Sequence, residues 1–158
     1  MGMKNFTKKI CAFVALVCMV MVMASCSEEK TEPSMPAAKM VEGSYVGNLT
    51  YKVLETNYEE KGLTYKVEAV SDNEINLVIS TFGNPPMQIP EVKVKTTVAG
   101  KDGEFVIPES VVEGVLEGGK KFTVTLRGSI KGKEAAIDFS LTYGNMPFPI
   151  ICSFKGSK

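Results

Sequence analysis

The cysteines are the side chains of this sequence with the clearest potential for chemistry. Cys11 and Cys18 lie inside an uncharged apolar run, Cys26 follows two small residues at its end, and Cys152 lies near the other end of the chain. The sequence contains no histidine, which removes the usual general base, the Ser-His-Asp and Cys-His arrangements and the commonest metal ligand. One cysteine in the folded part cannot build a thiolate metal site. We therefore expect no catalytic residue, no metal, no cofactor and no enzymatic activity.

The N-terminal segment has the layout of a signal peptide. Lys4, Lys8 and Lys9 precede an apolar run over residues 10–24. At about 1.5 Å per residue this run would span roughly 22 Å as a helix, which is short of a bilayer crossing. The pattern therefore predicts that residues 1–25 are a cleaved signal peptide, in preference to a permanent transmembrane helix.

The residues that end the apolar run give Cys26 a specific chemical role. Met23-Ala24-Ser25-Cys26 resembles a lipobox, the site at which signal peptidase II cleaves before a cysteine that carries diacylglycerol, with Met23 in place of the usual leucine. The resemblance implies that Cys26 is the lipid attachment site and that acyl chains hold the mature protein to a membrane, at about 0.8 kcal/mol per buried methylene. Ordinary secretory cleavage after Ala24 or Ser25 is the alternative.

Residues 26–42 are expected to form a flexible tether behind the lipid, because they are rich in charge and proline and offer little to bury. Glu28 and Glu29 follow the lipid-bearing cysteine closely and resemble the surface-export signal of lipoproteins from gut Gram-negative anaerobes. This resemblance implies an outer membrane lipoprotein at the cell surface. A periplasm-facing location is the alternative, because solvated tethers are often acidic.

Composition limits what the mature protein can be. Removing the three signal-peptide lysines from the 18 basic residues leaves 15 against 18 acidic ones, a formal charge of −3. No basic patch favours a nucleic acid partner. Only Cys152 remains once Cys26 carries lipid, so the mature protein can form no intramolecular disulfide. Residues 43–158 are therefore expected to fold as one domain held together by burial alone.

From Ser44 onward, apolar residues alternate with polar ones, which is typical of strands with one wet face. Paired glycines and Gly-Asn steps between the runs favour tight turns, so neighbouring strands should be antiparallel. Eight runs let the first and last strands pair and close an eight-stranded antiparallel up-and-down β-barrel, which removes exposed edges. A two-sheet sandwich is the alternative all-β fold. The runs lie near residues 44–55, 63–70, 74–82, 91–98, 104–117 with a bend at Pro108, 121–131, 135–143 and 147–155.

The two ends of the expected barrel carry a family resemblance. The opening Gly43-Ser44-Tyr45-Val46-Gly47 and the closing segment 148–156 resemble the calycin-like, or lipocalin-like, β-barrel domain found in such lipoproteins. The tryptophan that many true lipocalins place in their first strand is absent, since the chain has none. The resemblance implies a barrel on a lipid tether without fixing its ligand.

Strand parity predicts which loops share one end of the barrel. Loops over residues 56–62, 83–90, 118–119 and 144–146 should lie together, opposite the end where the tether enters and the C-terminus leaves. Two of these loops carry related Gly-Asn motifs with neighbouring aromatic, methionine and proline residues. Such side chains can bind apolar ligands or partner proteins, although they could instead plug the barrel. The candidate binding rim consists of Asn84, Pro86, Met87, Asn145, Met146 and Phe148.

The expected interior is crowded with large rings, which favours a filled barrel over a ligand-holding one. Cys152 alternates with apolar residues and should point inward as a small hydrophobe. We therefore expect a non-catalytic, membrane-anchored protein whose barrel binds an envelope protein or peptide. A lipocalin-like carrier of a small apolar ligand is the alternative. The inward aromatic positions are Tyr45, Tyr51, Tyr65, Phe105, Phe122, Phe139, Tyr143, Phe148 and Phe154.

Overall fold

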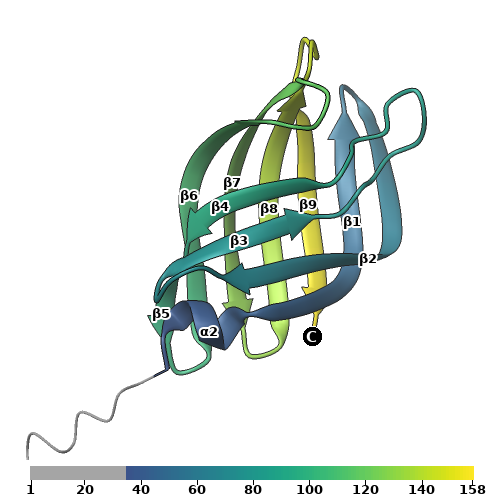
Figure 1. The fold of residues 1–158 in the computed structure, drawn as a ribbon. Coiled ribbons are helices and arrows are strands. Elements are labelled where there is room, and N and C mark those ends of the chain that lie inside the picture. Colours follow the sequence, from purple (N-terminus) through teal and green to yellow (C-terminus); the bar gives the residue numbers. More distant parts are fainter. Residues whose placement is uncertain (1–34) are drawn as a thin grey trace, which may run out of the picture. The chain divides into compact units, whose positions relative to one another are not determined.

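The computed structural model describes residues 35–158, which form one compact unit. Cys26, Glu28 and Glu29 lie outside the described residues. Within the described part, one short helix precedes nine strands that curl into a nearly closed antiparallel barrel (Figure 1). The elements are α2 (Ala37–Val41), β1 (Gly43–Val53), β2 (Thr56–Ala69), β3 (Glu74–Ile79), β4 (Val92–Thr97), β5 (Ala99–Lys101), β6 (Glu104–Val115), β7 (Lys121–Lys131), β8 (Glu134–Tyr143) and β9 (Ile150–Ser157).

The strand order is β4-β3-β2-β1-β9-β8-β7-β6-β5, so the first and last strands of the chain are neighbours. β1 and β9 run antiparallel and pair Gly47 with Gly156. The all-β antiparallel barrel predicted from the sequence is confirmed, including the pairing of its first and last strands. The pairing of β1 with β9 joins strands β1–β4 to strands β5–β9. All the other neighbours in the sheet are consecutive in the chain.

The strand count is nine where eight were expected, because the fourth run bends and changes partner. β4 pairs with β3, and after Val98 the chain continues as β5 and pairs with β6, matching Ala99 with Val106. Val98 is buried at the corner, and its N–H donates to the carbonyl oxygen of Asn73 at 2.8 Å. The predicted strand 91–98 thus belongs to a longer bent segment that reaches across to the other edge of the sheet.

The remaining gap in the barrel wall lies between β4 and β6. The pairing of β6 with β7 shifts register between Ile107 and Ser110, at Pro108, which cannot donate a ladder hydrogen bond. Across the gap, the hydroxyl oxygens of Thr96 and Ser110 are 2.9 Å apart. Side chains therefore complete the closure where the backbone ladder does not.

The first hairpin is longer than the sequence indicated. Residues 56–62 were expected to form a loop, but β2 starts at Thr56, and the turn is confined to Leu54 and Glu55. Tyr58 lies opposite Tyr51, and their rings stack with centroids 5.1 Å apart. This aromatic cross-strand pair stabilises the extension of the hairpin.

The centre of the barrel is filled by aromatic side chains. Tyr65 is fully buried and stacks on Phe154, with centroids 3.9 Å apart and planes 4° from parallel. The ring of Phe139, on β8, lies 6.3 Å from the ring of Tyr65 between centroids. Cys152 is also buried, 2% exposed, as the alternation of β9 indicates. The core is therefore a packed interior at this level of the barrel.

Steric crowding explains why the second residue of the Gly-x-Tyr-x-Gly opening that is glycine, Gly47, has no side chain. A Cβ at Gly47 would overlap the carbonyl oxygen of Lys155 and the Cα of Gly156. Glycine in a strand often marks such a close approach of two backbones. At Gly156 the ring of Phe154 occupies the space that a Cβ would take. The seam between β1 and β9 thus depends on paired glycines.

Helix α2 covers the end of the barrel where the described chain begins. Ala38 and Val41 are fully buried against the core. The Tyr45 hydroxyl donates to the Val41 carbonyl oxygen at 2.7 Å, and the Ala38 N–H donates to the Asp72 carbonyl oxygen at 3.0 Å. Residues 37–41, assigned to the flexible tether from the sequence, therefore belong to the folded unit, because Val41 and Ala38 supply the apolar surface that the barrel end needs.

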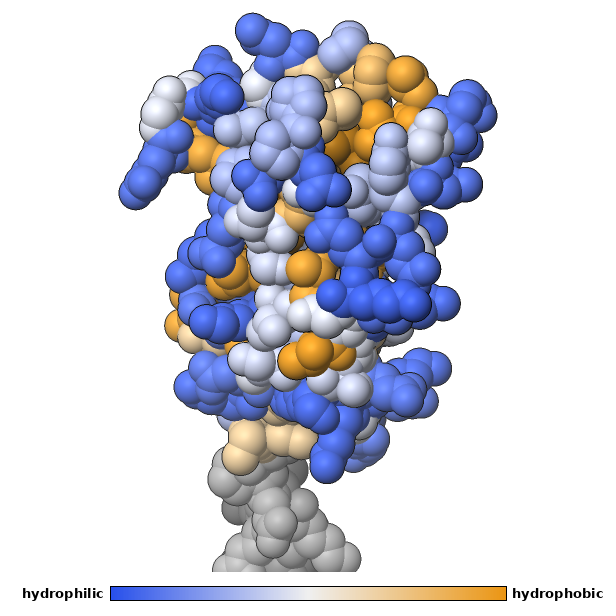
Figure 2. Space-filling view, turned by 90° about the vertical axis from the view of Figure 1, so that its right-hand side faces the viewer, coloured by the Kyte–Doolittle hydropathy of each residue, from blue (hydrophilic) through white to orange (hydrophobic). Residues whose placement is uncertain are grey.

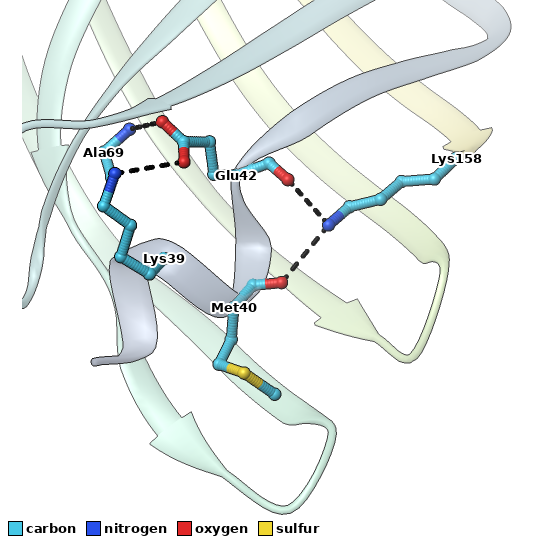
Figure 3. Close-up of polar contacts among 5 residues, drawn as sticks. All are labelled: Lys39, Met40, Glu42, Ala69 and Lys158. Carbon is cyan, nitrogen blue, oxygen red and sulfur yellow. Dashed lines mark hydrogen bonds and ion pairs between the residues drawn. The ribbon is translucent and has the colours of Figure 1, made fainter. Parts of the chain in front are cut away.

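The last residue of the chain fixes α2 in place (Figure 3). The Lys158 ammonium donates to the carbonyl oxygens of Met40 at 3.2 Å and Glu42 at 2.8 Å. The Glu42 carboxylate accepts from the Ala69 N–H and from Lys39, each at 3.2 Å. The hydrogen bond from the Ala69 N–H lowers the pKa of Glu42 most, and the hydrogen bond from Lys39 lowers it further. The entry end of the barrel is thus tied to both β2 and the C-terminus.

Removing α2 is expected to destabilise the domain. A chain of residues 43–158 should fold as a β domain without disulfide or metal, but with a free energy of unfolding about 2 kcal/mol below that of residues 35–158. Burial of a valine alone contributes about 1.5–3 kcal/mol, and the backbone entropy of ordering α2 offsets part of the total. Urea titration of the two chains measures the difference. Replacing exposed Met40 with alanine in the longer chain is the control, and an equally large loss there would contradict this account of α2.

Candidate functional site

The loop between β3 and β4 closes the barrel end opposite α2 (Figure 1). Phe82 and Ile89 exchange backbone hydrogen bonds of 3.1 and 2.8 Å, and both side chains are buried. Between them the Met87 N–H donates to the Asn84 carbonyl oxygen at 2.9 Å. Gly83 has φ +81°, and a Cβ there would lie 2.8 Å from the Met87 carbonyl oxygen. The loop therefore anchors two apolar residues inward and presents its tip outward.

A carboxylate on β2 holds this loop to the barrel wall. The Glu60 Oε1 accepts a hydrogen bond from the Gly83 N–H at 2.6 Å and another from the Tyr51 hydroxyl at 3.2 Å. Burial, followed by the neighbouring Glu60 carboxylate, raises the pKa of Tyr51 to about 12. Tyr51 is therefore neutral at pH 7 and acts as a hydrogen-bond donor. These contacts position the loop tip over the first hairpin.

The loop tip and the first hairpin enclose an apolar pocket of about 250 Å³. Tyr51 and Tyr58 stack on one side, and Phe82 meets Tyr51 edge-on with centroids 5.2 Å apart. Met87, 44% exposed, and Pro86 form the outer lip. Apolar side chains gather at this end of the barrel in the space-filling view (Figure 2). The pocket offers an aromatic floor and a flexible thioether wall.

A second, wider hollow of about 720 Å³ adjoins the first. Met87 lines both hollows, so the loop after β3 and the connection between β8 and β9 meet at this residue. The Lys120 ammonium lies 5.3 Å from the centroid of the Tyr143 ring. The lining of the second hollow includes Lys120, Lys121, Tyr143, Asn145, Met146 and Phe148, and no carboxylate.

Comparison with known families supplies the identity of this fold. Residues 41–157 match the model of the calycin-like beta-barrel domain. The chain belongs to this family. The calycin-like barrel is also similar to a solved structure from Bacteroides fragilis, that of a candidate outer membrane protein, with 26% sequence identity and a TM-score of 0.67. The alignment covers 78% of this chain and 53% of that one, so this chain spans about half the length of that protein. A search of curated proteins found no match.

The structure of the calycin-like barrel brings the six predicted rim residues to one end. Asn84, Pro86 and Met87 are exposed and line the apolar pocket. Asn145 is exposed, and Phe148 is half-buried in the wall of the second hollow. Met146 is also half-buried but packs against the core, so it supports the rim more than it faces outward. A binding role of these residues stays a prediction.

Sequence reasoning missed two groups that complete the site. Tyr58 was placed in a loop, and its stacking on Tyr51 depends on the register of the first hairpin. Lys120 and Lys121 were assigned no role from the sequence, and only the pairing of β6, β7 and β8 places them beside Tyr143. For Tyr58, the one signal in the sequence is its spacing of seven residues from Tyr51, which suits a cross-strand aromatic pair around a short turn.

The described residues of the calycin-like barrel offer little for metal binding or nucleophilic chemistry. No group of three or more His, Cys, Asp or Glu residues within 35–158 could hold a metal ion. Burial raises the pKa of the Cys152 thiol, and its Sγ lies 3.9 Å from the Ile150 carbonyl oxygen. The thiol therefore stays protonated at pH 7 and is a poor nucleophile. The same residues contain no helix long and apolar enough to cross a membrane.

Proposed function

We propose that this calycin-like protein is a non-catalytic envelope lipoprotein that binds a protein or peptide through its loop end. Cys26 anchors it to the outer membrane, and Glu28 and Glu29 direct it to the cell surface. The barrel presents its apolar pocket away from the anchor. Binding of a small apolar ligand in the same pocket is the alternative function.

One observation carries the proposal. The apolar pocket formed by Tyr51, Tyr58, Phe82 and Met87 opens at the barrel end opposite α2, where the described chain begins. Aromatic residues and methionine are enriched in protein interfaces and are frequent energetic anchors there. A partner at this end would approach without obstruction from the membrane to which the tether leads.

Two further observations support this choice. The Bacteroides fragilis protein that this chain resembles is a candidate outer membrane protein, which fits an envelope location. The buried stack of Tyr65 on Phe154 fills the barrel centre, and a barrel filled by side chains favours capture at the rim over a lipocalin-like cavity.

Replacing Met87 with alanine is expected to weaken partner capture while leaving the fold intact. Truncating an interface anchor costs about 1–2 kcal/mol or more, which corresponds to a five- to thirtyfold loss of affinity. Met87 is 44% exposed, so the free energy of unfolding should fall by less than about 1 kcal/mol. Affinity capture from detergent-solubilised envelopes, beside a urea titration, measures both quantities. The same pair of measurements on Phe148→Ala tests the other wall of the rim.

The control for these variants is Val111→Ala, since Val111 is 64% exposed on the barrel wall and away from both hollows. Capture by this variant should equal that of the wild type. Unchanged capture by Met87→Ala and Phe148→Ala, together with a large loss of stability, would mean that these residues plug the barrel and would contradict the proposed binding rim.

A further inference from the structure

Resting on the proposed function, we infer the class of partner from the charges at the rim: an extended peptide segment in which an apolar side chain is followed by acidic residues. The apolar side chain occupies the pocket beside Met87, and the acidic residues lie in the wider hollow near Lys120 and Lys121. The two hollows share Met87 as a wall, so neighbouring residues of one segment can reach both.

The apolar pocket has the size of one side chain. Its volume of about 250 Å³ is below the roughly 300–1,000 Å³ of pockets that enclose whole small ligands. Its floor is closed, because Phe82 is 1% exposed and packs edge-on against both Tyr51 and Phe139. An acyl chain would need a path past these rings into the barrel. A leucine, methionine or aromatic side chain needs none.

The wider hollow carries positive charge that no acidic residue in its lining neutralises. Lys120 and Lys121 line it without a carboxylate in the lining. The ion pairs found within residues 35–158 involve neither lysine. The aliphatic stem of Lys120 lies beside Gly144, and its ammonium faces the Tyr143 ring. These contacts hold one cation at the hollow, where it can pair with an acidic group of a partner.

The carboxylates near the rim do not cancel this charge. Glu60 already accepts hydrogen bonds from Gly83 and Tyr51 behind the apolar pocket. Glu117 lies in the exposed turn before Lys120 and lines neither hollow. Exposed Asn84 lines the apolar pocket and exposed Asn145 lines the wider hollow, and amide side chains can pair with the backbone of an extended segment. This combination favours a peptide over an anionic lipid.

Fluorescence anisotropy of three capped peptide pools with the full-length protein in detergent tests the inference. Every pool carries Leu, Met, Phe or Tyr at one position, followed by Asp and Glu, by Asn and Gln, or by Lys and Arg. An exposed ion pair changes the Kd by up to about fivefold. Because the acidic pool offers two such pairs where the basic pool offers two repulsions, the acidic pool should bind about tenfold more tightly than the basic pool. In about 0.5 M NaCl this preference should largely disappear.

Charge reversal at the rim provides the decisive comparison. The double variant Lys120→Glu with Lys121→Glu should lose the preference for the acidic pool. The matched control, Lys101→Glu with Lys133→Glu, makes the same change of net charge at the end of β5 and in the turn between β7 and β8, at the opposite end of the barrel, and should keep the preference. Equal binding of all pools, equal effects of the two double variants, or no peptide binding would overturn the inference. If binding ignores charge but falls in Met87→Ala, the proposed rim function stands and the acidic partner is wrong.

Discussion

Replacing Phe154 with alanine is expected to lower the free energy of unfolding by about 3–5 kcal/mol, as truncation of a core phenylalanine typically does. Phe154 is fully buried, stacks on Tyr65 at 3.9 Å and covers Gly156, which has no side chain of its own. The loss would be a large fraction of the 5–15 kcal/mol that usually stabilises a domain. The midpoint and slope of a urea titration, followed by circular dichroism, measure the effect.

The matched control lies on the same strand and faces the other way. Ile151 is 53% exposed on the outer surface of β9, so Ile151→Ala should change the free energy of unfolding by less than about 1 kcal/mol. Similar losses in the two variants would contradict the assignment of the inner and outer faces of β9, and with it the packed interior on which the rim proposal depends.

Replacing Cys26 with alanine is expected to release the protein from membranes completely. The thioether to diacylglycerol needs the cysteine sulfur, and once residues 1–25 are removed no acyl chain is left to hold the protein to the bilayer. Fractionation of cells into soluble and membrane proteins measures the change, and mass spectrometry of the mature wild-type N-terminus measures the modification itself.

Cys18→Ala is the control for the anchor, because Cys18 lies inside the predicted signal peptide. This variant should remain in the membrane fraction with a lipidated N-terminus. An unmodified mature N-terminus on the wild type, or membrane retention of a Cys26→Ala protein from which residues 1–25 have been removed, would contradict the lipoprotein prediction.

The barrel wall could be predicted because a strand with one buried face repeats every two residues. β7 shows this clearly, with Phe122, Val124 and Leu126 buried and Lys121 exposed. The change of partner at Val98 could not be predicted, because β5 is only three residues long and all three are exposed, so no alternation marks it as a strand. Helix α2 was also missed, since five residues are too few to show a helical stripe.

The candidate site was only half visible in the sequence. Strand parity and the paired Gly-Asn motifs placed Met87 and Phe148 at one end, and the structure brings their loops together. The stacked pair Tyr51 and Tyr58 and the cation at Lys120 depend on strand register. Register is set by long-range pairing that a single sequence does not show.

The two ends of the barrel are held by different contacts. α2 and Lys158 secure the end where the described chain begins, whereas the loop after β3 is held by Glu60 and exposes Met87 at the other end. Membership of the family accounts for the barrel fold but not for the loops. As in other folds that many functions share, we expect the loops to determine which partner is bound.

Site-specific photo-crosslinking in intact cells tests the central claim most directly. A photoreactive amino acid is placed at Met87, in the rim, or at Lys133, in the turn between β7 and β8 at the end beside α2. We expect discrete crosslinked products with an envelope protein from position 87 and none from position 133. Products from position 133 alone, or the same products from both positions, would contradict a binding site at the loop end.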